Sequence, residues 1–341
     1  MANKCWRIRV RIRELGERGL ISRIHRLQSP PPMGFVGIGD DAAYLPSSKH
    51  GWLATSDMLV EGRHFRWDWI EPEQLGEKAV AVNVSDIVAM GGIPRGCLTS
   101  LSVGGDVDVE VVEGIYRGMA RALDRYGATL LGGDTVGGRE GIVLDVTILG
   151  EPGADKPVLR RGSKPGDRLM VTGRLGAAYA GLLLLQHGVR WPGRNAAERS
   201  LLTAQIAPQV RVEAGLALAP LAHAMTDISD GLVAELAEFV RFGGIGAQVL
   251  EERLPIDEAT RQLAETEKSL AAEWAYYGGE DYELLAAVPP SRLAEARERL
   301  DQASVSYAEI GIITDTPGIR GILPDREERN LDATRGYNHF A

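Results

Sequence analysis

The chain has 341 residues, a quarter of them charged, and a formal net charge of -9 at pH 7. This length exceeds one ordinary hydrophobic core of about 150 residues, so it predicts two domains. The acidic balance argues against a nucleic-acid binder, and the longest apolar run, 177–185, is too short for a membrane span.

Cysteine and histidine usage removes further classes of protein. With only Cys5 and Cys97, neither a disulfide framework nor a cysteine-based zinc site can be built. The six histidines form no His-Glu-x-x-His pair, which argues against zinc catalysis. We expect a cytoplasmic protein.

The first thirty residues are rich in arginine, but they contain Glu14 and Glu17 and lack the apolar core of a signal peptide. We expect a leader followed by an amphipathic helix over 14–27. The predicted organisation is therefore a leader with its helix over 1–30, an N-terminal domain over 31–150 and a C-terminal domain over 151–341.

Apolar periodicity predicts helices and strands in alternation. Strands are expected at 34–36, 52–56, 97–103, 129–131 and 142–149, with helices at 74–90 and 109–126. Glycine and proline are dense over 150–167, which is typical of a connection between domains. Beyond it, strands are expected at 168–172, 224–227, 247–250, 282–288 and 308–313, with helices at 177–186, 231–242, 269–275 and 291–303. The fold class is α/β, with two domains and mixed sheets of α+β character.

Two aspartates, Asp40 and Asp41, stand in the turn Gly-Ile-Gly-Asp-Asp-Ala at 37–42, directly after the first expected strand. A Gly-x-Gly-x-x-Ala turn usually offers backbone N–H groups to a pyrophosphate. Carboxylates there would repel it, since two unit charges about 4 Å apart interact by about 4 kcal/mol at an effective dielectric of about 20. The pair fits beside a phosphate only with divalent cations between them, so the loop predicts metal–phosphate chemistry.

Acidic residues recur in small polar settings along the chain. They occur in Thr-Ser-Asp at 55–57, Asn-Val-Ser-Asp at 83–86, Gly-Gly-Asp-Thr at 132–135, Thr-Asp-Ile-Ser-Asp at 226–230 and Gly-Glu-Asp at 279–281. One such segment is more often a turn or a helix cap. Together they indicate hard oxygen ligands, which suit Mg²⁺ or Mn²⁺.

Two of these segments fall at informative places. In the helix expected at 74–90, Asn83 and Asp86 share a face; they form either a polar edge facing solvent or an aspartate presented to a metal. The segment 225–232 runs from a strand into a helix, with Ser229 or Asp230 as the expected N-cap. Helix starts bind phosphate through their free N–H groups, and carboxylates on both sides of the cap again require a metal.

Taken in order, these motifs resemble the thiamine-monophosphate kinases, within the superfamily of aminoimidazole ribonucleotide synthetase-like ATP-binding proteins. The motifs that carry the resemblance are Leu-Gly-Glu at 15–17, the aspartate loop 37–42, 55–57 with Gly-Arg-His-Phe at 62–65, 81–91, 131–135, Lys-Pro-Gly-Asp at 164–167, 227–232, 278–284 and Gly-Tyr-Asn-His-Phe at 336–340. They span nearly the whole chain.

The resemblance implies transfer of the γ-phosphate of ATP onto thiamine monophosphate, giving thiamine diphosphate, with several Mg²⁺ ions and a homodimer. It also implies that the N-terminal domain, 31–150, binds metal and ATP and dimerises. It implies as metal ligands Asp41, Thr55, Ser56, Asp57, Asp86, Asp134, Asp227 and Asp230. It implies as ATP contacts Tyr116, Gly133, Asp134, Ser229 and Arg160, with Arg161 as the alternative to Arg160. It implies as contacts to the thiamine substrate His64, Glu280 and Tyr337.

The residues leave other interpretations open. His64 and Tyr337 could simply pack, although an aromatic face suits a cationic thiazolium. Another ATP-dependent synthetase of the same superfamily is the nearest rival, and a non-catalytic protein that binds nucleotide or metal is the rival of a different class. The chain has neither a Walker A loop nor a His-Arg-Asp kinase loop. An acceptor phosphate is already ionised near neutral pH, so the predicted transfer requires no general base.

Overall fold

The computed structural model describes residues 11, 20, 23–30, 32–33, 51–139, 141–241 and 244–336. The predicted strand at 34–36, the aspartate loop with Asp41, and Tyr337 lie outside the described residues. The chain divides into two compact units. The N-terminal unit comprises 1–47, 54–83 and 95–149, and the C-terminal unit comprises 48–53, 84–94 and 150–341.

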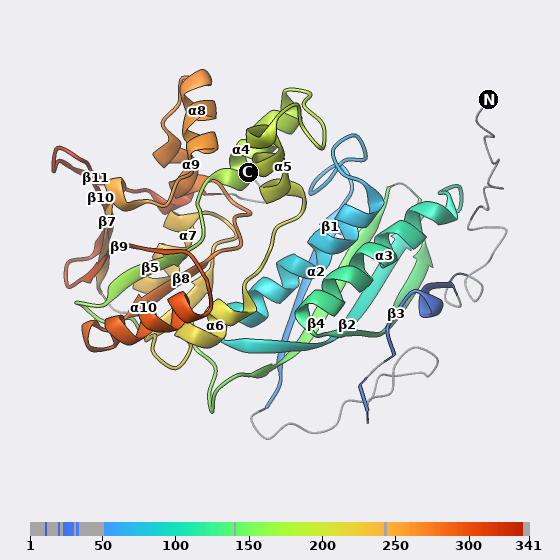
Figure 1. The fold of residues 1–341 in the computed structure, drawn as a ribbon, viewed down its shortest axis with the longest axis horizontal. Coiled ribbons are helices and arrows are strands. Elements are labelled where there is room, and N and C mark those ends of the chain that lie inside the picture. Colours follow the sequence, from blue (N-terminus) through green and yellow to red (C-terminus); the bar gives the residue numbers. More distant parts are fainter. Residues whose placement is uncertain are drawn as a thin grey trace. The chain divides into compact units, whose positions relative to one another are not determined.

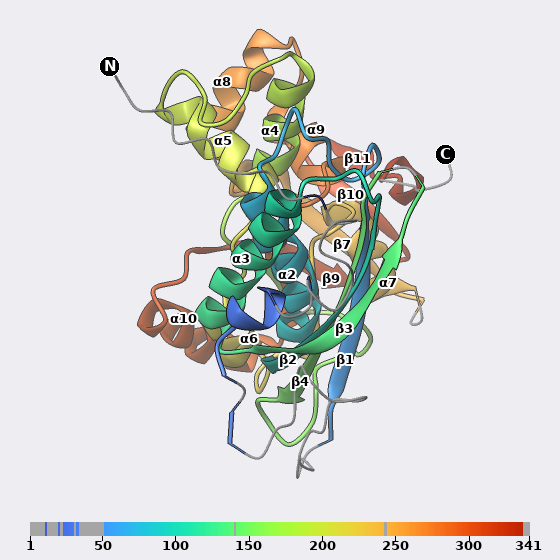
Figure 2. The same cartoon turned by 90° about the vertical axis from the view of Figure 1, so that its right-hand side faces the viewer.

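The N-terminal unit is built on a four-stranded sheet with the strand order β1-β4-β2-β3. Its strands are β1 (Leu53–Val60), β2 (Gly92–Val103), β3 (Thr129–Gly137) and β4 (Val143–Pro152), and its helices are α2 (Pro72–Ala89) and α3 (Val109–Tyr126). Residues 84–89 at the end of α2 belong to the C-terminal unit, as do Leu53 of β1, 92–94 of β2 and 150–152 of β4. The neighbours β2 and β3 run parallel. Along β4 buried and half-buried side chains alternate, because successive side chains of a strand point to opposite faces. The helices cover one face of this sheet (Figures 1 and 2).

Helices α2 and α3 approach closely because glycine replaces a side chain where they touch. A Cβ atom added at Gly76 would lie 1.9 Å from the carbonyl oxygen of Ile115, and one added at Gly118 would lie 1.8 Å from that of Glu73. Ion pairs flank the contact, with Arg117 Nε 2.9 Å from Glu73 Oε1 and Arg121 Nε 2.9 Å from Glu77 Oε1. The two helices are thereby held as one layer.

The C-terminal unit is built on a seven-stranded mixed sheet with the order β11-β10-β7-β9-β5-β8-β6. Its strands are β5 (Arg168–Thr172), β6 (Ala224–Asp227), β7 (Gly246–Leu250), β8 (Leu284–Val288), β9 (Tyr307–Thr314), β10 (Gly318–Ile322) and β11 (Glu328–Asn330). Its α-helices are α4 (Ala177–Gln186), α5 (Ala196–Ile206), α6 (Val212–Leu218), α7 (Leu232–Val240), α8 (Glu258–Thr266), α9 (Ala271–Tyr277) and α10 (Leu293–Gln302). Three short 3₁₀ helices, η1 (Glu251–Arg253), η2 (Pro290–Arg292) and η3 (Ala333–Arg335), complete it.

The core of this unit lies between the sheet and helix α7. The apolar stripe of α7, with Leu232, Leu236 and Phe239, packs on buried residues of the strands such as Val249 and Leu285. The pairing of β7 with β10 is parallel, and the other pairings of the sheet are antiparallel. Both units thus mix helices with a sheet, and the α/β fold class with mixed sheets is confirmed.

Some predicted element bounds need correction. The strand expected at 282–288 begins at Leu284, because Glu280 and Tyr282 have φ of 67° and 50° and cannot continue a strand. Helix α7 begins at Leu232, so its N-cap is Gly231 rather than Ser229 or Asp230. The sequence prediction also omitted α5, α6, α8, β10 and β11. Of the described helices, none combines the length and the hydropathy that crossing a bilayer requires.

Candidate active site

Strand β1 places the Thr-Ser-Asp motif on both faces of the N-terminal sheet. Thr55 and Asp57 share the face of the buried Leu53, whereas Ser56 points to the other face. There the Ser56 hydroxyl donates to Asp145 Oδ1 at 3.1 Å and shares a hydrogen bond of 2.9 Å with Thr147 Oγ1. The strand therefore separates the side chain of Ser56 from those of Thr55 and Asp57.

Strand β3 carries the second acidic motif of this unit, Gly-Gly-Asp-Thr. Asp134 is exposed, and its Oδ1 accepts a hydrogen bond of 2.9 Å from the backbone N–H of Thr135. Gly133 is required by the pairing of β3 with β2, since a Cβ atom there would lie 1.9 Å from the carbonyl oxygen of Thr99. The carboxylate of Asp134 is therefore exposed to solvent and accessible to a ligand.

Tyr116 lies in α3 and is 3% exposed, so it belongs to the core of the N-terminal unit. Burial raises the pKa of its phenol, and the hydroxyl interacts with Thr135 and Thr99. In this structure Tyr116 therefore supports the strand that carries Asp134.

His64 follows β1 in a turn. Its Nδ1 accepts a 3.0 Å hydrogen bond from the N–H of Val60, and this bond fixes the orientation of the imidazole ring.

In the C-terminal unit, Asp227 ends strand β6 and is 1% exposed. Its Oδ2 accepts a 2.7 Å hydrogen bond from Ser85 Oγ, near the end of α2. Burial, and after it the charge of Asp86, raises the pKa of Asp227 to about 7. Ser85 is fully buried, as is Asn83. The interpretation of this segment as a polar edge facing solvent is therefore wrong.

A third acid, Glu235, lies beside Asp227 in α7 and is 4% exposed. Its carboxylate accepts hydrogen bonds of 3.4 Å from both Thr226 Oγ1 and Ser229 Oγ, and burial raises its pKa. Arg160 Nη2 lies 4.0 Å from Asp227 Oδ1. The structure thus brings Arg160, Ser229 and Asp227 together at the start of α7.

Gly231 makes the turn that opens this helix. Its φ of 105° lies in the region that favours glycine, and a Cβ atom there would lie 3.0 Å from the carbonyl oxygen of Tyr276. The residue before it, Asp230, interacts through its backbone with the carboxylate of Glu235. Asp230 therefore lies at the same helix start as Ser229.

The segment 278–283 runs beside the end of β6. The N–H of Glu280 donates to Ser229 O at 2.7 Å, and the N–H of Tyr282 donates to Ile228 O at 2.9 Å. The side chain of Glu280 accepts a hydrogen bond from Gln205 Nε2 of α5. Glu280 is thus held next to the start of α7, although 50 residues separate the two motifs in the sequence.

Asp281 has a structural task in the same segment. Its carboxyl group accepts hydrogen bonds from the N–H of Gly176 at 2.8 Å and from that of Ala178 at 3.3 Å, at the start of α4. Removal of this carboxyl group from water raises its pKa to about 8. The hydrogen bonds hold the loop that carries Glu280.

The residues around Asp227 fit a divalent cation. Its Oδ1 is buried and has no hydrogen-bond partner in the described part of the chain, which is costly unless another group meets it. Asp86 adds a second negative charge beside it. Among the described residues, no three side chains of His, Cys, Asp or Glu are gathered to hold a metal ion. Mg²⁺ commonly uses only one or two carboxylates, with water and phosphate oxygens completing its shell.

Three residues of these arrangements were not singled out from the sequence. Ser85 lies inside the Asn-Val-Ser-Asp motif, but its hydrogen bond to Asp227 joins residues 142 positions apart and is not visible in the sequence. Glu235 could have been recognised from the sequence, because this acid interrupts the apolar stripe of α7. Asp145 could not, because an acid on the half-buried face of a strand such as β4 is ordinary.

Comparison with known proteins assigns the chain to a family. Its residues 39–151 match the family model of AIR synthase related protein, N-terminal domain, and residues 164–324 match that of the C-terminal domain. Thiamine-monophosphate kinase of Aquifex aeolicus (strain VF5) is 36% identical over 333 residues, which cover 97% of this chain and 100% of the relative.

Solved structures agree with this assignment. Thiamine-monophosphate kinase from Stenotrophomonas maltophilia K279a has a TM-score of 0.80 and 32% identity, over 89% of this chain and 95% of that chain. AaThiL complexed with AMPPCP and TMP has a TM-score of 0.75 and 33% identity, over 98% of this chain and 100% of that chain. The chain therefore belongs to the thiamine-monophosphate kinase family and contains both AIR synthase related domains.

Proposed function

We propose that the chain transfers the γ-phosphate of ATP to the phosphate of thiamine monophosphate, giving thiamine diphosphate and ADP. The observation that carries this proposal is the similarity, over 98% of the chain, to a structure that holds AMPPCP and TMP. AMPPCP is an ATP analogue, so that structure holds the two classes of substrate together. The arrangement of acids around Asp227 supports the proposal independently.

The acids are suited to holding Mg²⁺ between two polyanions. We propose Asp86, Asp227 and Asp230 as ligands from the C-terminal unit, and Asp41, Thr55, Ser56, Asp57 and Asp134 as ligands from the N-terminal unit. Ser56 would take part through its backbone, because its side chain is engaged by Asp145 and Thr147. Bound Mg²⁺ would neutralise charge on the reacting phosphates.

The remaining polar groups would bind and orient the two substrates. We propose Arg160 and Ser229, at the start of α7, as contacts to ATP phosphates, and Gly133 and Asp134 as further ATP contacts. The Ser229 hydroxyl donates to Glu235 in this structure and would turn to donate to a phosphate oxygen. Tyr116 would act indirectly, through its support of β3. His64, Glu280 and Tyr337 are proposed to contact the thiamine portion. Glu280 is suited to this because its carboxylate complements the cationic thiazolium.

The transfer is proposed to be direct and in line. The acceptor phosphate is ionised near neutral pH, so its oxygen is already a nucleophile. What the protein must supply is position and charge compensation, which dominate phosphoryl transfer. No proton transfer from a side chain is needed.

We also propose that the chain forms a homodimer and that it is located in the cytoplasm. Met58 of β1 and Val136 of β3 are both 52% exposed in the N-terminal unit, and exposed apolar side chains on a sheet suit an interface. Light scattering of the purified chain tests the dimer, and a mass of 36.9 kDa would contradict it.

The choice of acceptor tests the proposed function. Unphosphorylated thiamine has the same rings and positive charge, but it lacks the phosphate that is the proposed nucleophile. Both its binding and its reactivity should therefore be reduced, and the two defects multiply in kcat/KM. We expect kcat/KM for thiamine monophosphate to exceed that for thiamine by far more than tenfold in the same Mg²⁺ buffer. A ratio within about tenfold, which is only about 1.4 kcal/mol, would mean that the substrate is wrongly assigned.

The same assay separates the rival functions. Another synthetase of the superfamily would consume ATP with a different acceptor, so aminoimidazole precursors belong in the comparison. A protein that only binds nucleotide would leave the γ-phosphate of ATP in place with every acceptor.

A further inference from the structure

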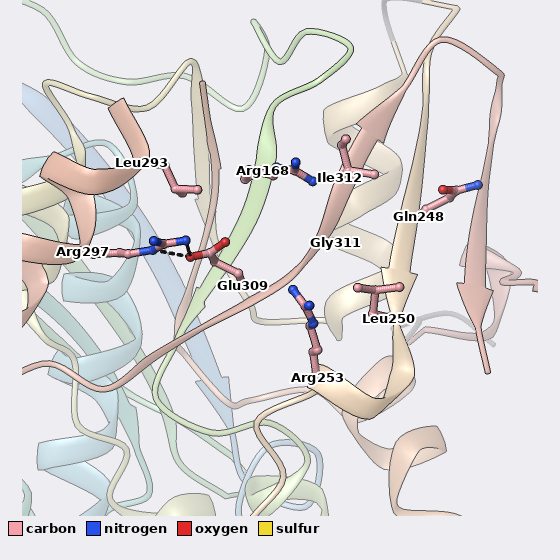
Figure 3. Close-up of a pocket in the computed structure, with 9 residues that line it drawn as sticks. All are labelled: Arg168, Gln248, Leu250, Arg253, Leu293, Arg297, Glu309, Gly311 and Ile312. Carbon is pink, nitrogen blue, oxygen red and sulfur yellow. Dashed lines mark hydrogen bonds and ion pairs between the residues drawn. The ribbon is translucent and has the colours of Figure 1, made fainter. Parts of the chain in front are cut away.

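A hollow in the C-terminal unit is lined by none of the residues of the candidate active site. Its volume is about 470 Å³, and strands β5, β7 and β9 line it together with η1 and α10. Figure 3 shows Arg168, Arg253 and Arg297 extending from three different elements toward the stretch of β9 that carries Glu309 and Gly311. None of these residues belongs to the acidic motifs.

The charge of this hollow is opposite to that of the whole chain. Three arginines and a single carboxylate, Glu309, line it, whereas the chain carries a net charge of -9. Arg297 forms an ion pair with Glu309. Arg168 and Arg253 are exposed, and within the described part of the chain they have no ion-pair partner. Two positive charges are therefore left uncompensated in one hollow.

The rest of the lining is suited to a ring. Leu250, Leu293 and Ile312 are half-buried, so they offer apolar surface, and Gln248 adds an amide that can donate and accept hydrogen bonds. Pockets that bind small molecules typically have about 300–1,000 Å³ and combine such apolar surface with a few polar groups. The hollow has both the size and the composition of a small-molecule site.

We propose that this hollow binds a small diphosphate that carries a ring, with its phosphates on Arg168 and Arg253 and its ring against Leu250, Leu293 and Ile312. Guanidinium groups match phosphate oxygens through paired hydrogen bonds. They require no metal ion, in contrast to the acidic site, where phosphate without a cation would be repelled. This difference makes the two sites separable by experiment.

The test is isothermal titration calorimetry of the full chain in EDTA, with ADP and thiamine diphosphate as probes and inorganic pyrophosphate as the ring-free comparison. We expect one equivalent of ADP or thiamine diphosphate to bind, and pyrophosphate to bind more weakly. The double variant Arg168→Ala/Arg253→Ala should weaken binding by about tenfold or more, since two charge-assisted contacts are lost. Arg261→Ala, which removes an exposed arginine of α8 outside the hollow, should leave it unchanged.

A gain of affinity provides the second arm. Glu309→Gln removes the only carboxylate of the hollow and releases Arg297, so it should tighten binding of the same probe; a misfolded variant would not do so. Three outcomes would overturn the proposal: no binding of either ringed diphosphate in EDTA, equal loss in Arg261→Ala and the double variant, or pyrophosphate binding as tightly as the ringed probes. The proposed kinase activity could fail without affecting this test, because no transfer is measured.

Discussion

Asp227 combines burial, a nearby like charge and an oxygen without a hydrogen bond. Each of these lowers stability when the carboxylate is ionised, so the arrangement has a cost for folding that binding of a cation would offset. Strained or unsatisfied groups of this kind concentrate at functional sites. Ser85 fixes one oxygen of Asp227. The other, Oδ1, accepts no hydrogen bond from the described residues and lies 4.0 Å from Arg160 Nη2.

Asp227→Asn should therefore reduce turnover without unfolding the protein. We expect kcat to fall by about 100-fold or more, which corresponds to about 2.7 kcal/mol of barrier, because one charge of the proposed metal site is lost. The midpoint of thermal unfolding in EDTA should stay the same or rise, since the repulsion from Asp86 is removed. Asp325→Asn, an exposed turn residue, is the control. Near-normal turnover of Asp227→Asn at ordinary Mg²⁺ concentration would refute the role of this carboxylate.

Asp281 predicts a dependence of stability on pH. Its pKa is raised from 3.8 to about 8 in the folded protein, so between those values the folded state holds a proton that the unfolded state has lost. This contribution to stability is fully present below pH 3.8 and is lost as the pH rises through about 8. Urea unfolding at pH 5 and pH 8 should show that Asp281→Asn flattens the fall in stability. If the free energy of unfolding falls between pH 5 and pH 8 by the same amount in the variant as in the wild type, groups other than Asp281 cause the pH dependence.

At the scale of elements, the contact between α2 and α3 depends on Gly118. At an unobstructed helix position, replacing glycine by alanine stabilises the helix by about 1 kcal/mol. Here the added Cβ atom would lie 1.8 Å from the carbonyl oxygen of Glu73. We expect Gly118→Ala to lower the free energy of unfolding by about 1–3 kcal/mol, measured by urea denaturation. Gly137→Ala, where no atom lies within 4 Å of the added Cβ, should change it little. Stabilisation by Gly118→Ala would contradict the close packing.

Elements with a clear apolar period could be predicted from the sequence, and others could not. Helix α3 has the predicted bounds 109–126, because its apolar residues repeat at helical spacing. Strand β11, Glu-Arg-Asn, contains no apolar residue and is formed only by pairing with β10. Helix α8 is mostly polar on its surface and buries few residues. Tertiary contacts decide such segments, and one sequence does not display them.

The same division applies to the candidate site. Asp86 and Asp227 could be singled out because acids in small polar segments are unusual inside apolar elements. Their mutual proximity could not be derived, since it depends on where the end of α2 meets β6. The bond of Asp281 to the start of α4 likewise joins residues about a hundred positions apart. The extents 1–30, 31–150 and 151–341 stay a prediction.

At the scale of the whole molecule, the central claim is direct, Mg²⁺-dependent transfer from ATP to thiamine monophosphate. The most direct measurement incubates the purified chain with ATP labelled in its γ-phosphate and with thiamine monophosphate, in Mg²⁺ or in EDTA, and follows the label in products and protein. We predict that in Mg²⁺ the label appears in thiamine diphosphate, one per ADP formed, with none on the protein and no transfer in EDTA. Label that passes through the protein, or transfer that proceeds equally in EDTA, would contradict the claim.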